Sequence, residues 1–368
     1  MRSSRQAFYD RLYYKFELDL VNLFAKLKAC GPVKGFRDDD GSFERFFRET
    51  VRPYWKQFGV RAQRYWFRHY YQATGKLDHR FIPHNLHHRY VIPFFDDPAY
   101  ERQLEDKNLY SMIFPDQARP ETMFKYFAPN AFSQGPGSFC GEDFAPIGRD
   151  EALARVLAGG SFILKPTRDT GEGMDIKVFS AEDGRERIEA LLDSYARVDF
   201  IVQRLVRQHA DMANLNASSL NTIRLMTLVW QGEARILAGI VRIGSPGSHL
   251  DNVASGGCEV GIDLATGTLK KYGFTYADGL GAERTPGGVL LEGYQIPSWD
   301  KLQQTALNCA LRLPHLRLIG WDLAVDENGN VVLIELNCHF SQTQESNGPT
   351  FGEQTDEILT AVFGKKTS

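Results

Sequence analysis

Two carboxylates near the C-terminal end of the sequence are spaced so that they can face each other across a hairpin. The stretch GWDLAVDENGNVVLIELN, residues 320–337, contains Asn-Gly at 328–329, a dipeptide typical of two-residue type I′ turns. With this turn, Asp322 lies directly opposite Glu335 on one face of the hairpin. Two like charges at paired positions destabilise a sheet unless a cation lies between them, so the pattern indicates a cation site.

The neighbours of this acidic pair favour magnesium as the cation. Asn337 lies on the same face and offers a carbonyl oxygen, while Gly320 lies opposite Asn337 and leaves room. Magnesium is held by few carboxylates and fills its other positions with water and substrate phosphate oxygens. We therefore predict metal ligands at Asp322, Glu335 and Asn337. The alternative is a polar sheet face that is open to water.

The opposite face of the same hairpin is apolar and is predicted to pack on a core. It carries six large side chains, which are Trp321, Leu323, Val325, Val332, Ile334 and Leu336. A charged face and an apolar face on one hairpin fix which side is turned toward the core.

A lysine and a glycine-containing turn in FILKPTRDTGEGMDIKVF, residues 162–179, could hold phosphate groups. Lys165 ends an apolar strand, and Thr170, Gly171 and Gly173 are small enough for their backbone N–H groups to approach phosphate oxygens. The sequence has neither GxxxxGK[ST] nor GxGxxG between a strand and a helix, which excludes the Walker loop and the dinucleotide fingerprint. A plain surface hairpin is the alternative.

Two polar residues interrupt apolar strands further along the chain. Gln203 lies in FIVQRLV, and backbone groups at the end of such a strand can hydrogen-bond an adenine edge. Arg224 lies in TIRLMTLVW, where a buried guanidinium needs an anionic partner and its planar fork suits phosphate or carboxylate. That partner is either a bound ligand or an internal acid, so an internal salt bridge stays open.

The elements that must position these residues follow from the apolar patterns. Helices are predicted at 184–196 and 299–311, and the mixture of helical connections and tight turns favours an α+β fold with largely antiparallel sheets. Before residue 106 the chain is predicted to be mainly helical, and an apolar stripe there consists of Phe8, Leu12, Phe16, Leu20 and Phe24. The predicted strands are 161–166, 175–180, 200–206, 222–230, 234–244, 318–325 and 331–337.

Length and composition exclude several classes of protein. The 368 residues allow two to three domains, and 43% hydrophobic with 24% charged residues is ordinary globular composition. No stretch approaches the ~18 apolar residues of a membrane span, and the N-terminus does not read as a secretory signal. Five cysteines without a CxxC pair fit reduced thiols, so we expect a cytoplasmic protein.

The net charge of −3 hides a basic segment at residues 51–95. This segment contains eight Lys or Arg, one acidic residue and five of the nine histidines, together with many aromatic residues. Interleaved basic and aromatic residues can bind nucleic acid or face an anionic substrate, but a helical domain with a solvated basic face gives the same pattern. All three interpretations stay open.

Taken together, these motifs resemble the ATP-grasp superfamily, and most closely its branch of sugar-transfer-associated ATP-grasp proteins. The likeness runs from about Lys107 to Asn337 and rests mainly on the 320–337 motif and on SLNTIRL at 219–225, with support from TGEGMDI at 170–176 and the segment 251–269. It implies two α+β lobes that clamp ATP. The implied division is a mainly helical N-terminal region 1–105 and an ATP-grasp domain 106–368, with a small lid lobe at about 150–206 and a large metal-binding lobe at about 207–368.

The resemblance also implies a role for each site residue. Lys107 and Lys165 match the two nucleotide lysines, and Gly171 and Gly173, beside Thr170, match the flexible loop over the phosphates. Gln203 and Leu205 match the hinge beside adenine, and Arg224 matches the arginine that meets the transferred phosphate. A candidate acceptor loop consists of Asn252, Ser255, Gly256 and Gly257, with Arg242 on the preceding strand; an ordinary surface turn is the alternative.

The implied activity is ATP-dependent ligation of a carboxylate to an amine through an acyl phosphate, with Mg²⁺ and release of ADP and phosphate. The expected partners are a small carboxylate, such as a sugar acid or amino acid, and an amine, without nucleic acid or a membrane span; a homodimer is left open. Rival hypotheses are a small-molecule kinase and an inactive scaffold that binds RNA or a protein. A zinc site at His84, His87 and His88 is a further alternative.

Overall fold

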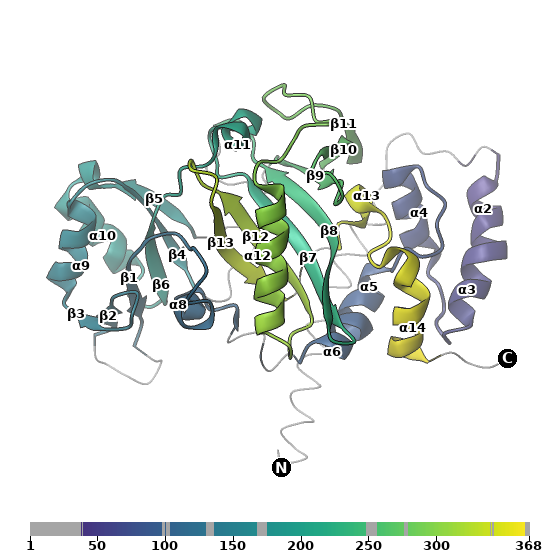
Figure 1. Ribbon diagram of the computed structural model, residues 1–368, viewed down its shortest axis with the longest axis horizontal. Coiled ribbons are helices and arrows are strands. Elements are labelled where there is room, and N and C mark those ends of the chain that lie inside the picture. The colour runs from purple at the N-terminus through teal and green to yellow at the C-terminus, as the bar shows by residue number, and fades with distance from the viewer. Residues whose placement is uncertain are drawn as a thin grey trace, which may run out of the picture.

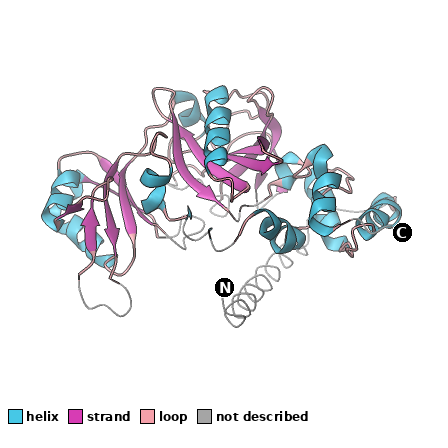
Figure 2. Cartoon of the chain, turned by 60° about the horizontal axis from the view of Figure 1, so that its bottom comes forward, coloured by secondary structure: helices cyan, strands magenta, loops and turns pink. Residues whose placement is uncertain are grey.

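A computed structural model describes most of the chain, and it consists of two antiparallel sheets and a helical region (Figures 1 and 2). The predicted apolar helix at 8–24 and five predicted site residues, Thr170, Gly171, Gly173, Asn252 and Ser255, lie outside the described residues. The described residues are 38, 40–97, 100, 104–129, 136–167, 175–247, 256–275, 279–338, 340 and 342–364.

The smaller sheet has six antiparallel strands in the order β3-β2-β1-β6-β4-β5. Its first strand begins at Thr122, ahead of the expected start of the lid lobe near residue 150. Helices α9 (Arg149–Leu157) and α10 (Arg185–Ser194) share one hydrophobic core with this sheet. The strands are β1 (Thr122–Phe127), β2 (Ser138–Cys140), β3 (Pro146–Ile147), β4 (Ser161–Pro166), β5 (Lys177–Ser180) and β6 (Phe200–Arg204).

The larger sheet has seven antiparallel strands in the order β11-β10-β9-β8-β7-β12-β13. The short α11 (Ala210–Leu215) follows the crossing from the smaller sheet, and α12 (Trp299–Arg312) precedes β12. The strands are β7 (Thr222–Trp230), β8 (Glu233–Ile243), β9 (Cys258–Ile262), β10 (Leu269–Thr275), β11 (Gly279–Ala282), β12 (Leu318–Val325) and β13 (Val331–Asn337). The two sheets confirm the prediction of a largely antiparallel α+β fold.

The two faces of the larger sheet pack against different parts of the chain. One face lies on α12, where Leu302 and Ala306 share a core with Leu225 and Trp321. On the other face, Met226 and Leu228 of β7 and Leu318 of β12 share a second core with the N-terminal helices. Side chains alternate along a strand, so Arg224 and Asp322 lie on this second face, beyond the edge of the helical packing.

The helical region is formed by short helices from the beginning of the described chain together with its C-terminal end. Figure 1 places these helices beside the larger sheet, on the side away from the smaller sheet. The elements are α2 (Ser42–Phe46), η1 (Phe47–Val51), α3 (Arg52–Lys56), α4 (Arg64–Thr74), α5 (His84–Leu86), η2 (His87–Val91), α6 (Ile92–Phe95), α13 (Gln344–Asn347), η6 (Gly352–Gln354) and α14 (Thr355–Phe363). We refer to this group as the helical module.

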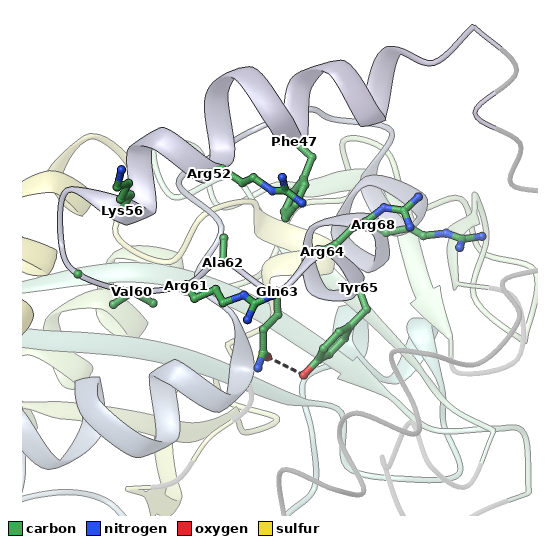
Figure 3. A pocket seen from close by; sticks show the side chains of 11 residues that line it. Phe47, Arg52, Lys56, Val60, Arg61, Ala62, Gln63, Arg64, Tyr65 and Arg68 are labelled. Atoms are coloured by element: carbon green, nitrogen blue, oxygen red, sulfur yellow. Dashed lines mark hydrogen bonds between the residues drawn. The ribbon is translucent and has the colours of Figure 1, made fainter.

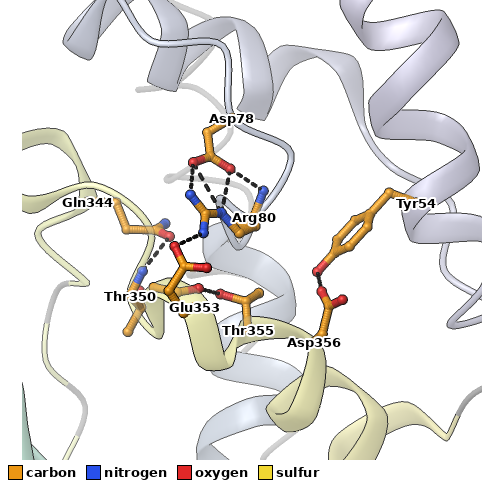
Figure 4. A network of polar contacts seen from close by, with 9 residues as sticks. Tyr54, Asp78, Arg80, Gln344, Thr350, Glu353, Thr355 and Asp356 are labelled. Carbon is orange, nitrogen blue, oxygen red and sulfur yellow. Dashed lines mark hydrogen bonds and ion pairs between the residues drawn. The ribbon is translucent and has the colours of Figure 1, made fainter.

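Polar contacts join the two chain segments of the helical module (Figure 4). Tyr54 donates a hydrogen bond to Asp356 over 2.6 Å. Arg80 is held by Asp78 and reaches Glu353 over 2.6 Å. The Gln344 side chain bonds both backbone groups of Ile82. The N-terminal helices are therefore fixed to the segment that follows β13.

The hairpin between β12 and β13 differs from the predicted two-residue turn. Asp326 pairs with Asn330, the Gly329 amide donates to the Asp326 carbonyl over 3.0 Å, and Gly329 has φ of 76°. This is a three-residue connection with a left-handed glycine. Near the turn, Leu323 pairs with Leu333 instead of the expected Ile334. An irregularity between Asp322 and Leu323 then restores the expected register, so Asp322 does lie opposite Glu335.

None of the helices in the described parts of the chain combines the length and apolar character needed to cross a membrane. Four of the five cysteines, Cys140, Cys258, Cys309 and Cys338, are described, and all are buried without a disulfide. This agrees with the predicted reduced thiols; the compartment stays a prediction.

Candidate functional site

Asp322 is held by two arginines on the second face of the larger sheet. Its side chain is only 2% exposed, and Arg224 donates Nε and Nη2 to its two carboxylate oxygens over 2.6 Å each. Arg242 adds a third hydrogen bond over 3.3 Å. Burial raises the pKa of Asp322 above its ordinary value, although both arginines favour the carboxylate. The salt-bridge alternative for Arg224 is therefore correct, and Asp322 positions the two guanidinium groups.

Glu335, opposite Asp322, is more accessible and is paired with Lys107. The Lys107 Nζ lies 3.0 Å from Glu335 Oε2, and the Glu335 side chain is 27% exposed. Burial opposes ionisation of Glu335, but Lys107, Arg224 and Lys165 outweigh it and lower the pKa to about 2. The carboxylate is therefore ionised throughout the physiological pH range, in a form that can bind a cation.

Lys107 and Lys165 reach this acid from the side of the smaller sheet. Lys107 begins η3 (Lys107–Leu109), which Asp106 caps by accepting a hydrogen bond from the Asn108 amide. The Lys107 amide donates to the carbonyl of Thr167 just after β4. Lys165 lies on β4 and is 9% exposed. Both predicted nucleotide lysines are thus placed beside Glu335.

The surroundings of Asn337 and of the neighbouring Gly320 differ from the sequence prediction. The Asn337 Nδ2 is buried and makes no hydrogen bond to any atom of the described residues. An unpartnered N–H donor beside Glu335 fits a side chain that donates to a ligand oxygen, such as an oxygen of a phosphate group. The room that Gly320 was expected to leave is filled, because Phe340 lies 3.1 Å from where a Cβ would be. Both Asp322 oxygens accept N–H groups of Arg224, so Asp322 is the more occupied of the two acids; the three metal ligands stay a prediction.

The register change in the hairpin turns two apolar side chains toward the smaller sheet. Val331 and Leu333 join the core on α12, in place of the predicted Val332 and Ile334. Ile334 instead lines a narrow hollow of ≈ 10 Å³ with Lys107 and Gln203. The prediction of the core face of β13 was wrong for Val332 and Ile334, because the bulge shifts the alternation of side chains between itself and the turn, and it was right for Leu336 beyond the bulge.

A second hollow lies where the chain leaves the smaller sheet. Its volume is ≈ 320 Å³, and its lining includes Leu205 and Val206 after β6, and Val332 of β13. The Leu205 amide is held by the carbonyl of Ser161 over 3.0 Å. Most of the other lining residues are charged or polar, so Leu205, Val206 and Val332 form a small apolar part of the wall, against which a flat ring could lie. The two predicted hinge residues, Gln203 and Leu205, therefore line neighbouring hollows.

Two further acidic residues, Glu259 and Glu345, lie beyond the arginines, and the sequence analysis missed both. Arg242 of β8 pairs in register with Glu259 of β9. Glu259 accepts a hydrogen bond from Ser346 over 3.2 Å, and Glu345, which directly precedes Ser346, pairs with His69 of α4 over 2.8 Å. Burial and the nearby Glu345 charge raise the pKa of Glu259 to about 7. The helical module thus contributes His69 to the edge of the site.

A third missed residue is Lys125 of β1, which lines the same narrow hollow as Lys107. Its Nζ donates to Ser111 Oγ and to the Glu142 carbonyl, both over 2.8 Å. Burial lowers the pKa of Lys125 to about 8. The signal that identified Arg224, a cation within an apolar strand, was also present in TMFKYF.

The remaining predicted sites have different outcomes. Gly256 and Gly257 directly precede β9, and Gly256 has φ of 87°, a conformation that favours glycine. The other two residues of the acceptor loop lie outside the described residues. His84, His87 and His88 do not form a metal site, since no group of three His, Cys, Asp or Glu among the described residues could hold an ion. The zinc alternative is not supported.

Basic and acidic groups follow one another along the site. Two lysines stand beside Glu335 and Asn337, two arginines hold Asp322, and Glu259 follows next to Arg242. Cations at both ends of the Glu335–Asp322 pair can neutralise phosphate oxygens, and a partly protonated carboxyl near pH 7 can exchange a proton.

Sequence comparison places the chain in a family. A profile of the family described as sugar-transfer associated ATP-grasp matches residues 92–351. This stretch is well over half of the chain, so the protein belongs to that family, and the predicted ATP-grasp fold is confirmed. No curated protein matches the chain in sequence.

Solved structures with a similar fold include several ligases. ATP-grasp ligase PsnB in complex with a minimal precursor, Mg and ADP is 14% identical, with a TM-score of 0.41 over 73% of this chain and 62% of PsnB. D-alanyl-alanine synthetase A from Vibrio cholerae is 14% identical, with a TM-score of 0.41 over 73% and 66%. D-alanine–D-alanine ligase from Bacillus anthracis with ATP is 12% identical, with a TM-score of 0.38 over 71% and 66%. The chain spans less than two thirds of these relatives, and the likeness concerns the fold alone.

Proposed function

We propose that this member of the sugar-transfer associated ATP-grasp family joins a small carboxylate to an amine at the expense of ATP. The observation that supports this proposal most is the pair Lys107–Glu335 beside the buried Arg224–Asp322–Arg242 cluster. Such a site can bind a metal–nucleotide at one end and an anionic intermediate at the other. A sugar acid or an amino acid is the proposed class of carboxylate.

Lys107, Lys165, Glu335 and Asn337 form the proposed nucleotide end. The two lysines neutralise phosphate oxygens, and Glu335 with Asn337 would hold magnesium, which spreads negative charge of the phosphates when bound. Leu205 and Gln203 are the proposed contacts to the adenine ring, with Val332 as the facing wall. Thr170, Gly171 and Gly173 remain the proposed loop over the phosphates, and Asp322 serves chiefly to position arginines.

Arg224 and Arg242 form the proposed reaction centre. A carboxylate oxygen attacks the γ-phosphorus, the bond to the β–γ bridging oxygen breaks, and ADP leaves. Two guanidinium groups beside the new acyl phosphate stabilise its negative charge in a partly buried place. The amine then attacks the acyl carbon, inorganic phosphate leaves, and an amide remains.

Glu259 is the proposed acceptor of the proton that the amine loses. It lies next to Arg242 in register, and its pKa near 7 suits proton exchange at physiological pH. Gly256 and Gly257, at the start of the same strand, with Asn252 and Ser255 are the proposed contacts to the substrate.

Release of ADP across pools of sugar acids and amino acids, each with a pool of amines, tests this proposal. Carboxylates labelled with ¹⁸O extend the test, because attack through a carboxylate oxygen transfers one labelled oxygen to inorganic phosphate. Labelled phosphate together with an amide product supports the ligase. A phosphorylated product without free phosphate identifies a kinase, and no turnover with any pool identifies a binding scaffold.

A further inference from the structure

The helical module carries a large basic groove that the proposed reaction does not use. Its volume is ≈ 1060 Å³, and it lies between α3, the following turn and the start of α4 (Figure 3). None of its lining residues is acidic, and five are basic: Arg52, Lys56, Arg61, Arg64 and Arg68. Figure 1 shows α3 and α4 on the side of the larger sheet away from the smaller sheet, so this groove is separate from the site at Glu335.

The sequence forces these cations outward because the aromatic residues between them form a core. Trp55, Phe58, Trp66, Phe67 and Tyr70 are at most 4% exposed. The chain reverses at a glycine after α3, and this reversal brings the two basic stretches to opposite walls of one groove. The interleaved basic and aromatic pattern is therefore an amphipathic one, with aromatic rings inside and charges along the groove.

The positive charge of the groove is poorly balanced within the protein. Arg64 pairs with Glu44 across the end of the groove. In the part of the chain that the structure describes, no ion pair joins Arg52, Lys56 or Arg61 to any acid, and Arg52 only stacks over the ring of Phe47 at 5.2 Å. Clustered like charges repel one another, and this repulsion is relieved when an anion binds between them.

We propose that this groove binds a small molecule that carries two or more phosphate groups. Four of the five cations are arginines, whose planar forks suit phosphate oxygens, and each phosphate brings close to two negative charges. The volume of the groove is larger than that of one phosphate group, and it lies at the upper end of the volumes of small-molecule binding sites. Figure 3 shows Arg52 on one wall and Arg61 on the other, with Arg64 and Arg68 at one end, so several phosphates can be held at once.

The buried aromatic residues favour a small ligand over nucleic acid. Single-stranded nucleic acid is bound by stacking its bases on exposed aromatic rings beside a basic track. Here Trp55 and Trp66 lie in the core, and Tyr65, the one aromatic group on the groove with a polar tip, donates its hydroxyl to Gln63 over 2.7 Å. The groove thus offers one partly exposed ring, that of Tyr65, instead of a row of rings on which successive bases could stack.

Titration calorimetry with tripolyphosphate, without magnesium and at fixed ionic strength, tests the proposal. The groove variant, Lys56→Gln with Arg61→Gln, changes two exposed side chains that make no ion pair among the described residues, so the fold is retained. We expect the variant to bind tripolyphosphate about tenfold or more weakly than the unmodified protein. The matched control, Arg187→Gln with Arg197→Gln on the exposed surface of the smaller lobe, removes the same charge and is expected to bind within about twofold of the unmodified protein.

A cleft variant separates this site from the nucleotide site. Lys107→Ala with Lys165→Ala is expected to keep tripolyphosphate binding at the groove. The proposal is overturned if the cleft variant abolishes all binding, or if the control pair weakens binding as much as the groove pair. It is also overturned if orthophosphate binds as tightly as tripolyphosphate, or if single-stranded RNA binds more tightly at the same salt concentration.

Discussion

The site on the larger sheet and the groove on the helical module differ in how far their charged side chains are paired within the protein. On the sheet, each acid has a basic partner: Glu335 has Lys107, and Asp322 has Arg224 and Arg242. In the groove, Arg64 pairs with Glu44, and no ion pair among the described residues involves Arg52, Lys56 or Arg61. A buried charge is costly unless it is paired within the protein, because it has lost its contact with water. An exposed charge is solvated by water and can remain without a protein partner until a ligand binds. Substitutions should therefore affect folding at the first place and binding alone at the second.

From this comparison we expect the largest loss of both stability and activity for Arg224→Ala. Removing this arginine leaves the carboxylate of Asp322 buried with one weak partner, which costs about 3–5 kcal/mol of unfolding free energy and abolishes turnover. Denaturant unfolding measures the first effect. The double variant Arg224→Met with Asp322→Leu removes both charges and should recover most of the stability without the activity. Equal instability of the single and double variants would show that pairing is not the cause.

Glu335→Gln should separate activity from stability. Glu335 is 27% exposed and Lys107 is 14% exposed, so the loss of this charge-assisted pair should cost about 1.5–3 kcal/mol, less than Arg224→Ala costs. The proposed turnover should nevertheless fall roughly 10²–10³-fold, because a charge that holds the metal–nucleotide is gone. Steady-state ADP release, with circular dichroism as the folding control, tests this. Turnover near that of the unmodified protein would contradict the role of Glu335.

Glu259 predicts a dependence of stability on pH. Its folded-state pKa of about 7 lies above the ordinary value of 4.5, so between these values the folded state binds more protons than the unfolded state. Stability should therefore fall as pH rises from about 4.5 to 7, by roughly 3 kcal/mol. The Glu259→Gln variant cannot ionise there and should lack this part of the decrease. Parallel Tm profiles of variant and unmodified protein would contradict the assignment.

The smallest effect on folding is expected in the groove. Lys56→Gln with Arg61→Gln removes two unpaired like charges, so stability should stay equal or rise by a few tenths of a kcal/mol. Thermal unfolding at low and high salt measures this, since salt screens the repulsion and should erase the difference. Destabilisation by more than about 1 kcal/mol would show that these side chains have structural partners.

Local patterns predicted the strands with strong apolar runs, and failed where pairing depends on distant residues. The bounds of β4, β7, β12 and β13 agree with the predicted ranges. The strands β1 to β3 and β9 to β11 were missed, because they are short or interrupted by charged and small residues. Their stability comes from neighbours in the sheet rather than from their own sequence.

The candidate site shows the same division. The alternation of side chains predicted correctly that Asp322 faces Glu335. The predicted turn was one residue too short, and the bulge between Asp322 and Leu323 restores the expected pairing. Alternation could not reveal that Arg224 binds Asp322, because β7 and β12 are paired only by the fold. The approach of His69 to the site likewise depends on the packing of the helical module against the segment after β13. Contacts of this kind leave no local signal.

Calorimetric binding of the magnesium complex of AMPPNP tests the central claim most directly. The account predicts one site per chain, with affinity reduced at least about tenfold in Glu335→Gln and unchanged in the groove pair Lys56→Gln with Arg61→Gln. Unchanged affinity in Glu335→Gln, together with a loss in the groove pair, would contradict it and move the nucleotide site to the helical module.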